Sequence, residues 1–433
     1  MQNASFRAVA RKTKNTNKEA ARIHQNRGDT PPTKESPVSP YPMQPIVLVH
    51  DWLTGLRGGE KCLEVLCRRF PQARLFTLFH IPGSTSPPIE RMRITTSFLQ
   101  QFPGVGRYYR WLLPLMPWAV GSLSIPRRTR LVVSLSHAAA KSIRTPVSAP
   151  HVCYCFTPMR YAWVQPEQYL PLSGPWPRRL FGYLGRGVLA WMRAWDRRTA
   201  SRVSHFVAIS QTVADRIAAF YGRRSVVIYP PVDTEFYTPG PSAQLSQDAC
   251  REDYYLCVSA LVPYKRIDLA IEACRRLGRR LVVVGEGPER RRLEEMAGPG
   301  VQLVGWAPPE TLRQYYRQAR ALLFPALEDF GITPVEAQAC GCPVIAYGQG
   351  GATETVLPAG PGRPGTGLLF RTQTVDALSR AMLLLEAHPE WFDLALARRQ
   401  AERFASARFE QELVGYLEDV LAGRAPSDRT DHP

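Results

Sequence analysis

The sequence is short of acidic residues and of long apolar runs, and each shortage excludes a class of protein. Its 433 residues include 37 Asp and Glu against 55 Lys and Arg, which gives a net charge of +18. This charge favours anionic partners such as phosphates, nucleic acid or an anionic membrane surface. The most apolar stretch, residues 111–125, contains two prolines and is shorter than the roughly 20 residues that span a bilayer. We therefore expect no transmembrane helix.

The nine cysteines lack the Cys-x-x-Cys spacing that is typical of zinc and redox sites. Several of them lie in apolar runs such as residues 152–156, where a free thiol behaves as a small buried hydrophobic group. We therefore expect no metal and a reducing, cytoplasmic compartment.

The composition changes along the chain and predicts its organisation. Residues 1–45 are rich in proline, lack apolar periodicity and carry eight Lys and Arg against three Asp and Glu. They are predicted to be a disordered basic tail; a targeting peptide, or a translation start at Met43, is the alternative. Apolar runs then alternate with amphipathic stretches, and a Pro/Gly/Ser-rich stretch at 238–252 interrupts the series. Alternation of this kind predicts a doubly wound α/β fold.

We predict two Rossmann-like domains that face a central cleft. Their proposed limits are 46–235 for the N-terminal acceptor domain and 236–400 for the C-terminal nucleotide-sugar donor domain, followed by a C-terminal helix and tail, 401–433, that returns to the N-terminal domain. The predicted strands of the two sheets are 46–50, 131–135, 152–156, 205–209 and 226–229, and then 254–258, 280–284, 301–304, 321–324 and 343–346.

Three loops of this pattern are candidates for anion binding, because ligands of such sheets bind near helix N-termini. Gly58 and Gly59 would let a diphosphate approach the backbone, although a tight turn explains the pair equally well. Lys265 and Arg266 oppose the dipole of the helix they precede unless an anion compensates; a solvated basic turn is the alternative. The segment 284–288 lacks the third glycine of a dinucleotide fingerprint and predicts a strand-to-helix turn at the floor of a nucleotide pocket.

The fourth loop, residues 324–343, is the most specific. Glu328 lies in the loop and Glu336 one turn into the following helix, so both carboxylates can face one cleft and accept hydrogen bonds from sugar hydroxyls. The segment 331–333 presents free backbone N–H groups at the helix start. A helix-capping acid and a surface acid would explain each glutamate singly but not the whole pattern.

These motifs resemble the signature of the retaining GT-B glycosyltransferases of family 4. The resemblance rests on the two glutamates, on segments 337–346 and 350–354, and on Leu-Val-Pro-Tyr-Lys-Arg-Ile-Asp at 261–268. Segments 49–53 and 153–163 are similar to a subgroup of mannosyltransferases of surface polysaccharide assembly. The match covers residues 46–415.

The resemblance implies an enzyme that moves a hexose from a nucleotide diphosphate sugar, with GDP-mannose as first choice, to a glycan or lipid-linked acceptor. It implies front-face displacement with retained configuration. Glu336 would hold the donor ribose, Glu328 would face the hexose, and Lys265 would neutralise the diphosphate. His137 matches the N-domain histidine near the transferred sugar, and Arg266 is a secondary cation. The remaining predicted donor-binding positions are Gly58, Gly59, Phe330, Gly331, Ile332 and Thr333.

The sequence departs from the family pattern at two positions. Ala260 stands where many members carry arginine, so one of two expected phosphate cations is absent or is supplied by Arg266. Phe156 stands where a histidine is common, which puts a polar contact in doubt. No Asp-x-Asp occurs in the chain, so we expect neither a metal-bridged donor nor any other metal cofactor.

Two other classes of function and one further partner are compatible with parts of the sequence. A GT-B nucleotide-sugar epimerase would share the fold and the donor site. A nucleic-acid-binding protein would use the charge, but no binding motif occurs, so no nucleic acid is expected. The basic aromatic stretches 107–118 and 176–198 would suit a peripheral position at the inner face of the cytoplasmic membrane; packed helices with solvated cations are the alternative.

Overall fold

The structure is a computed structural model that describes residues 45–163, 176–240 and 252–425, with no side chains described for 176–184. Apart from Pro45, the predicted basic tail lies outside these residues. Within them, no helix combines the length and the apolar character needed to cross a membrane.

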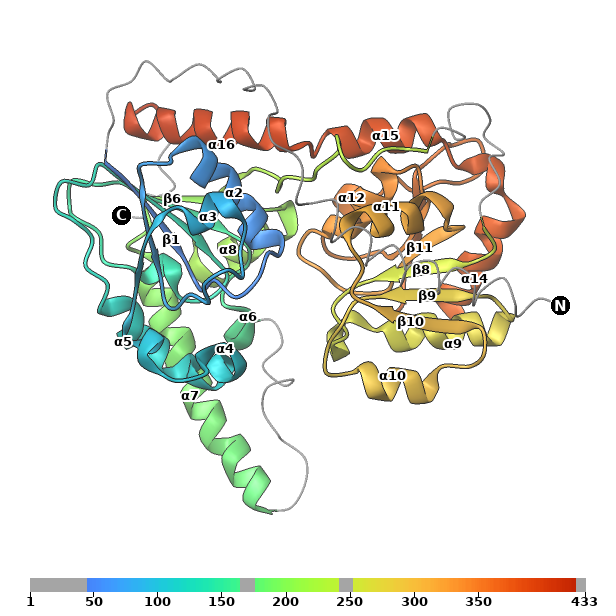
Figure 1. The fold of residues 1–433 in the computed structure, drawn as a ribbon, viewed down its shortest axis with the longest axis horizontal. Coiled ribbons are helices and arrows are strands. Elements are labelled where there is room, and N and C mark those ends of the chain that lie inside the picture. The colour runs from blue at the N-terminus through green and yellow to red at the C-terminus, as the bar shows by residue number, and fades with distance from the viewer. Residues whose placement is uncertain (1–44, 164–175, 241–251, 426–433) are drawn as a thin grey trace, which may run out of the picture. The chain divides into compact units, whose positions relative to one another are not determined.

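The first sheet has seven parallel strands in the order β3-β2-β1-β4-β5-β6-β7 (Figure 1). The strands are β1 Ile46–His50, β2 Arg74–Thr77, β3 Arg93–Thr96, β4 Leu131–Ser136, β5 His151–Cys155, β6 His205–Ala208 and β7 Val226–Val227. Five of them match predicted strands to within a few residues. Strands β2 and β3 were not predicted; both are short and begin with an arginine.

Both faces of this sheet are covered, as the continuous apolar strands predicted. Val47 and Val49 of β1 belong to one buried cluster together with Met192 and Trp195 of α7. Leu48, which points to the opposite face, belongs to a second cluster. The helices of this lobe are α2 Gly58–Arg69, α3 Pro87–Glu90, α4 Val105–Tyr108, α5 Met116–Gly121, α6 Arg160–Trp163, α7 Trp176–Ala200 and α8 Gln211–Tyr221, with 3-10 turns η1 Phe98–Gln101, η2 Tyr109–Leu115 and η3 Ala140–Ser142.

The second sheet has six parallel strands in the order β10-β9-β8-β11-β12-β13. They are β8 Tyr255–Val258, β9 Leu281–Val284, β10 Val301–Gly305, β11 Ala321–Phe324, β12 Val344–Tyr347 and β13 Gly367–Phe370. The first five match predicted strands, and β13 was missed. The helices are α9 Ile267–Leu277, α10 Arg290–Met296, α11 Pro309–Gln318, α12 Ile332–Ala339, α13 Ala352–Thr355 and α14 Val375–Ala387, with 3-10 turns η6 Pro263–Lys265 and η7 Pro389–Trp391.

The last two helices, α15 Leu394–Glu402 and α16 Ser406–Leu421, contact different lobes. Helix α15 packs on α12, whereas α16 packs on α2 of the first lobe (Figure 1). Between them the Val232 N–H donates to the Phe404 carbonyl at 2.8 Å, and Phe409 of α16 is fully buried. The chain therefore crosses between the lobes near residue 232 and again near residue 404.

Candidate functional site

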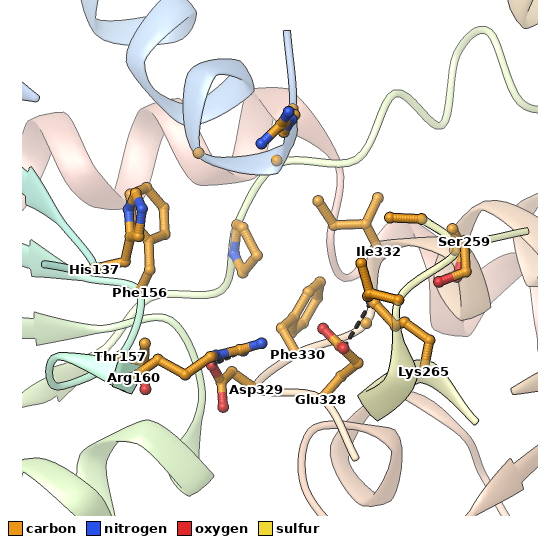
Figure 2. A pocket seen from close by; sticks show the side chains of 18 of the residues that line it. His137, Phe156, Thr157, Arg160, Ser259, Lys265, Glu328, Asp329, Phe330 and Ile332 are labelled. Carbon is orange, nitrogen blue, oxygen red and sulfur yellow. Dashed lines mark hydrogen bonds and ion pairs between the residues drawn. The ribbon is translucent and has the colours of Figure 1, made fainter. Parts of the chain in front are cut away.

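A cavity of about 850 Å³ is lined by residues of both lobes. The loops that follow β1, β4 and β5 supply one wall, and the loops that follow β8 and β11 supply the other. In Figure 2, His137, Phe156 and Arg160 lie on one side of this space, and Ser259, Lys265 and Ile332 lie on the other. The cavity therefore lies at the carboxyl ends of parallel strands, where ligands of α/β sheets bind.

Most of the predicted site residues line this cavity. Those that do are His137, Gly58, Gly59, Lys265, Glu328, Phe330, Gly331, Ile332, Thr333 and Glu336. The predicted secondary cation Arg266 is not among the lining residues. Its backbone is left-handed, with a φ of 52°, and its Nε lies 3.3 Å from Asp268 Oδ1. The guanidinium of Arg266 is thus engaged beside its own helix start rather than in the cavity.

Glu328 and Lys265 form an ion pair in the cavity, with 2.7 Å between Oε1 and Nζ (Figure 2). Both side chains are largely buried. The loop of Glu328 is supported from behind by the glycine pair at 350–351, because a Cβ on Gly350 would lie 2.3 Å from the Glu328 carbonyl oxygen. The Gly351 N–H donates to that same oxygen at 2.9 Å. These glycines therefore allow the close backbone contact that fixes the Glu328 loop.

Glu336 lies in α12 and is almost completely buried. Its Oε1 is 3.2 Å from Lys61 Nζ, and its Oε2 accepts a hydrogen bond from the Tyr316 hydroxyl at 3.0 Å. The Glu336 carboxylate raises the pKa of Lys61, and burial of the ammonium opposes this effect. Lys61 had no predicted role, although it follows the Gly58-Gly59 pair in the first turn of α2.

The glycine pair at the start of α2 lies against both lobes. Neither Gly58 nor Gly59 has a positive φ. This contradicts the interpretation of the pair as a tight turn, because such a turn needs a positive φ. A Cβ on Gly58 would lie 2.7 Å from Ile332 Cδ1 of the other lobe, and one on Gly59 would lie 3.3 Å from the Phe156 ring. These glycines therefore bring the N-terminus of α2 close to the N-terminus of α12.

His137 is positioned by the buried carboxylate of Asp51. That carboxylate accepts the backbone N–H groups of residues 137, 138, 139 and 140. His137 Nδ1 lies 3.1 Å from Asp51 Oδ2, and the ring packs edge-on against Trp52 with 4.6 Å between centroids. Desolvation lowers the pKa of His137, and the Asp51 charge opposes this shift. A neutral His137 with Nδ1–H donating to Asp51 leaves Nε2 for other contacts.

Asp329 connects the Glu328 loop to the first lobe. Arg160 of α6 and Arg216 of α8 both bind its carboxylate. Burial opposes ionisation of Asp329, but the two guanidinium groups outweigh it and lower the pKa of the acid. Arg160 also lies over the Tyr264 ring at 5.3 Å. Asp329 and Arg160 lie within the motifs 324–343 and 153–163, but no role was predicted for either, because nothing local indicates that they meet.

Segment 284–288 leads from β9 into a turn before α10, as predicted, and its role in a nucleotide pocket stays a prediction. A Cβ on Gly285 would lie 1.9 Å from the Ser259 carbonyl oxygen, and one on Gly287 would lie 2.3 Å from that of Leu261. Pro288 and Ser259 line the cavity. The Gly-x-Gly segment therefore packs behind the loop that carries Lys265. No cluster of three or more metal-ligating side chains occurs in the part of the chain that the structure describes.

Two family models match the chain. The one described as "Glycosyl transferases group 1" matches residues 247–403, and the one described as "Glycosyltransferase Family 4" matches residues 56–236. The chain is 31% identical over 264 residues to a GDP-mannose-dependent alpha-(1-6)-phosphatidylinositol monomannoside mannosyltransferase of Mycolicibacterium smegmatis. The matched region covers 52% of this chain and 67% of that relative. It is 29% identical to a D-inositol 3-phosphate glycosyltransferase of Mycobacteroides abscessus, over 53% of this chain and 55% of the relative.

Solved structures share the fold at lower sequence identity. The complex of Anabaena HepE with UDP superposes with a TM-score of 0.62 at 18% identity, over 87% of this chain and 100% of that protein. Sucrose-phosphate synthase from Thermosynechococcus elongatus gives a TM-score of 0.63 at 18% identity, over 88% of this chain and 100% of the synthase. These structures confirm the predicted fold class of two Rossmann-like domains that face a cleft.

Proposed function

Because the chain belongs to the glycosyltransferases of group 1 and family 4, we propose that it transfers a hexose from a nucleotide diphosphate sugar to a glycan or lipid-linked saccharide. The observation that carries this proposal is the cavity in which Glu328, Glu336 and Lys265 meet the start of α12. Carboxylates accept hydrogen bonds from sugar hydroxyls, and cations together with a helix N-terminus stabilise phosphates.

In the proposed donor complex, Glu336 binds the ribose and Glu328 faces the hexose. Each carboxylate has a lysine partner in the structure, at 3.2 Å for Lys61 and 2.7 Å for Lys265. Donor hydroxyls therefore share or replace these contacts. Lys265 then faces the diphosphate, and with the backbone N–H groups at Ile332 and Thr333 it stabilises the charge that develops on the leaving group.

His137 lies on the opposite wall, and we propose that it contacts the transferred hexose through Nε2. Its contact with Asp51 at 3.1 Å fixes the orientation of the ring. Because we assign no enzymatic nucleophile with a partner general base, we propose front-face displacement with retained configuration as the transfer step. In that step the departing phosphate oxygen accepts the proton of the attacking hydroxyl. No metal is included in the proposal.

Mannose from GDP-mannose is the first candidate donor. It is favoured by the mannosyltransferase relative, whose name states that it is GDP-mannose-dependent, and by the resemblance of segments 49–53 and 153–163 to mannosyltransferases. The same relative is named for a phosphatidylinositol mannoside acceptor, which favours a lipid-linked acceptor. On this basis we propose a position at the cytoplasmic face of an anionic membrane.

A surface of the first lobe supports the membrane position. Trp111 and Trp118 are 86% and 60% exposed, and Trp118 stacks on Trp191 of α7 with 5.5 Å between centroids. Arg110, next to Trp111, lines the cavity. Exposed tryptophans among cations suit an anionic interface, and this surface would place an acceptor headgroup beside the cavity.

Calorimetry with GDP, UDP and ADP sugars tests the donor. We expect GDP-mannose to bind best, and clear selectivity for a UDP sugar would refute that choice. Glu336→Gln should weaken donor binding by about tenfold or more, because the charged acceptor of the ribose hydroxyls is lost. Glu310→Gln, on the exposed start of α11, is the matched control. Product analysis separates transfer from epimerisation, and a Glu336→Gln protein that binds donor normally would contradict the proposed site.

A further inference from the structure

The cavity contains more cations than its own carboxylates can neutralise. Four carboxylates line it, and each has a partner among the described residues. Lys61 pairs with Glu336, Lys265 with Glu328, and Arg160 with Asp329. The fourth, Glu60, accepts the Arg57 backbone N–H at 3.0 Å and lies 3.8 Å from His50 Nε2.

Two guanidinium groups of the cavity wall remain without a carboxylate. Arg57 and Arg110 both line the cavity, and neither has an ion-pair partner in the described part of the chain. A nucleotide diphosphate sugar carries a negative charge on each phosphate. An unpaired guanidinium binds such a group without giving up an existing contact, whereas Lys265 must leave or share Glu328.

The two arginines occupy different parts of the wall. The Arg110 guanidinium lies over the Tyr109 ring at 4.7 Å, and Tyr109 packs on Trp52, beside His137. Arg110 thus belongs to the aromatic side of the cavity. Arg57 directly precedes Gly58, at the point where α2 approaches Ile332 of α12. The Glu60 carboxylate holds the Arg57 backbone there at 3.0 Å.

We propose that Arg57 is the second phosphate-binding cation of the donor site. It takes the place of the arginine that many family members carry at the position of Ala260. The inference rests on the proposed function. Ala260 and Lys265 line the same cavity as Arg57, so a cation from either lobe can reach a diphosphate bound there. Arg266, the candidate from the sequence, lies outside the lining and contacts Asp268. The missing cation is therefore supplied across the cleft, by the other lobe.

The test measures binding of GDP and of guanosine by calorimetry to Arg57→Ala. Loss of a charged phosphate contact should weaken GDP binding by about tenfold and leave guanosine binding within about twofold. Arg266→Ala, whose guanidinium contacts Asp268 outside the cavity lining, should bind GDP as the wild type does, and so should the surface control Arg291→Ala on α10, whose side chain is 92% exposed. Ala260 is exposed, so Ala260→Arg in the Arg57→Ala background restores the cation from the other lobe and should recover most of the lost affinity.

Three results would overturn the inference: GDP binding unchanged in Arg57→Ala, an equal loss for GDP and guanosine, or no recovery with Ala260→Arg. These results are distinct from a failure of the proposed function. In that case the wild-type chain would bind none of GDP, UDP and ADP, and the variants would have no affinity to lose.

Discussion

One buried histidine, His151, shows how this chain accommodates an ionisable side chain in the core of a sheet. His151 is completely buried in β5, and its Nε2 lies 2.7 Å from the Ser134 hydroxyl. Burial, assisted by the charge of Lys141, lowers the pKa of His151 from 6.5 to about 3. A neutral histidine in this position needs no counter-ion, so it contributes to the sheet core rather than to the cavity.

The folded protein should lose stability through His151 as the pH falls below 6.5. Between pH 6.5 and 3 the unfolded chain binds a proton that the folded chain does not, so the free energy of unfolding decreases with falling pH. From pH 6.5 to 5 the loss due to this group is about 2 kcal/mol. Urea unfolding at both pH values should show that loss in the wild type and a smaller pH dependence in His151→Gln. Equal pH dependence in the two proteins would contradict the assignment.

At the scale of elements, the close approach of α2 and α12 shapes the cavity. The N-terminus of α2 has no side chain at Gly58 to separate it from Ile332. The first residues of both helices line the cavity, at 58–61 in α2 and 332–333 in α12. Two helix N-termini of opposite lobes can therefore act on one anion.

Gly58→Ala should destabilise the protein, although alanine is the better helix former. The added Cβ would lie 2.7 Å from Cδ1 at the flexible end of the Ile332 side chain, which must turn aside, so the net cost should be small, about 0.5 kcal/mol. Ile332→Val removes the Cδ1 atom. In the double variant the two effects should not add, with a coupling of about 0.5 kcal/mol in urea unfolding. Additive effects would show that the two helix starts are not in contact.

For the whole molecule, a few polar contacts, some of them buried, join the two lobes. Asp329 binds two arginines of the first lobe, and the Ser210 hydroxyl donates to the Asp329 carbonyl at 2.6 Å. Glu354 of the second lobe accepts the backbone N–H groups of Gln211 and Thr212 at 2.7 and 3.0 Å, at the start of α8. These contacts hold the Glu328 loop against the first lobe.

Asp329→Asn should cost about 2–4 kcal/mol of unfolding free energy, because two partly buried arginines lose their shared carboxylate. The control is Asp376→Asn. Asp376 pairs with Arg276 at the surface, where the side chains are 61% and 57% exposed, and removal of such a pair costs below about 1 kcal/mol. Equal costs in urea unfolding would show that the Asp329 contacts do not join the lobes.

The exposed tryptophans give a prediction for the whole molecule at a membrane. At low salt the protein should sediment with vesicles that contain phosphatidylglycerol and not with neutral vesicles. The double variant Trp111→Ala, Trp118→Ala should bind at least about fivefold more weakly, since two apolar groups no longer enter the interface. Trp306, which is 70% exposed on the second lobe, provides the control Trp306→Ala. An equal loss in the control, or indifference to lipid charge, would refute the proposed surface.

The sequence by itself determined the local features of this protein. Continuous apolar runs identified β1, β4 and β8 as strands of two parallel sheets. The spacing of Glu328 and Glu336 in one loop and helix was sufficient to place both carboxylates in one cavity. These features depend on residues that are close in the sequence, whose backbone conformation fixes their relative positions.

Only the tertiary structure decided which side chains meet across the cavity. Lys61 and Glu336 are separated by 275 residues, and Arg160 and Asp329 by 169, so no local pattern could pair them. The same holds for β2 and the edge strand β3, which are only four residues long and are defined by pairing with β1 and with each other. Contacts of this kind arise when separate sheets and helices pack, because burial then makes each charge depend on a partner from another element.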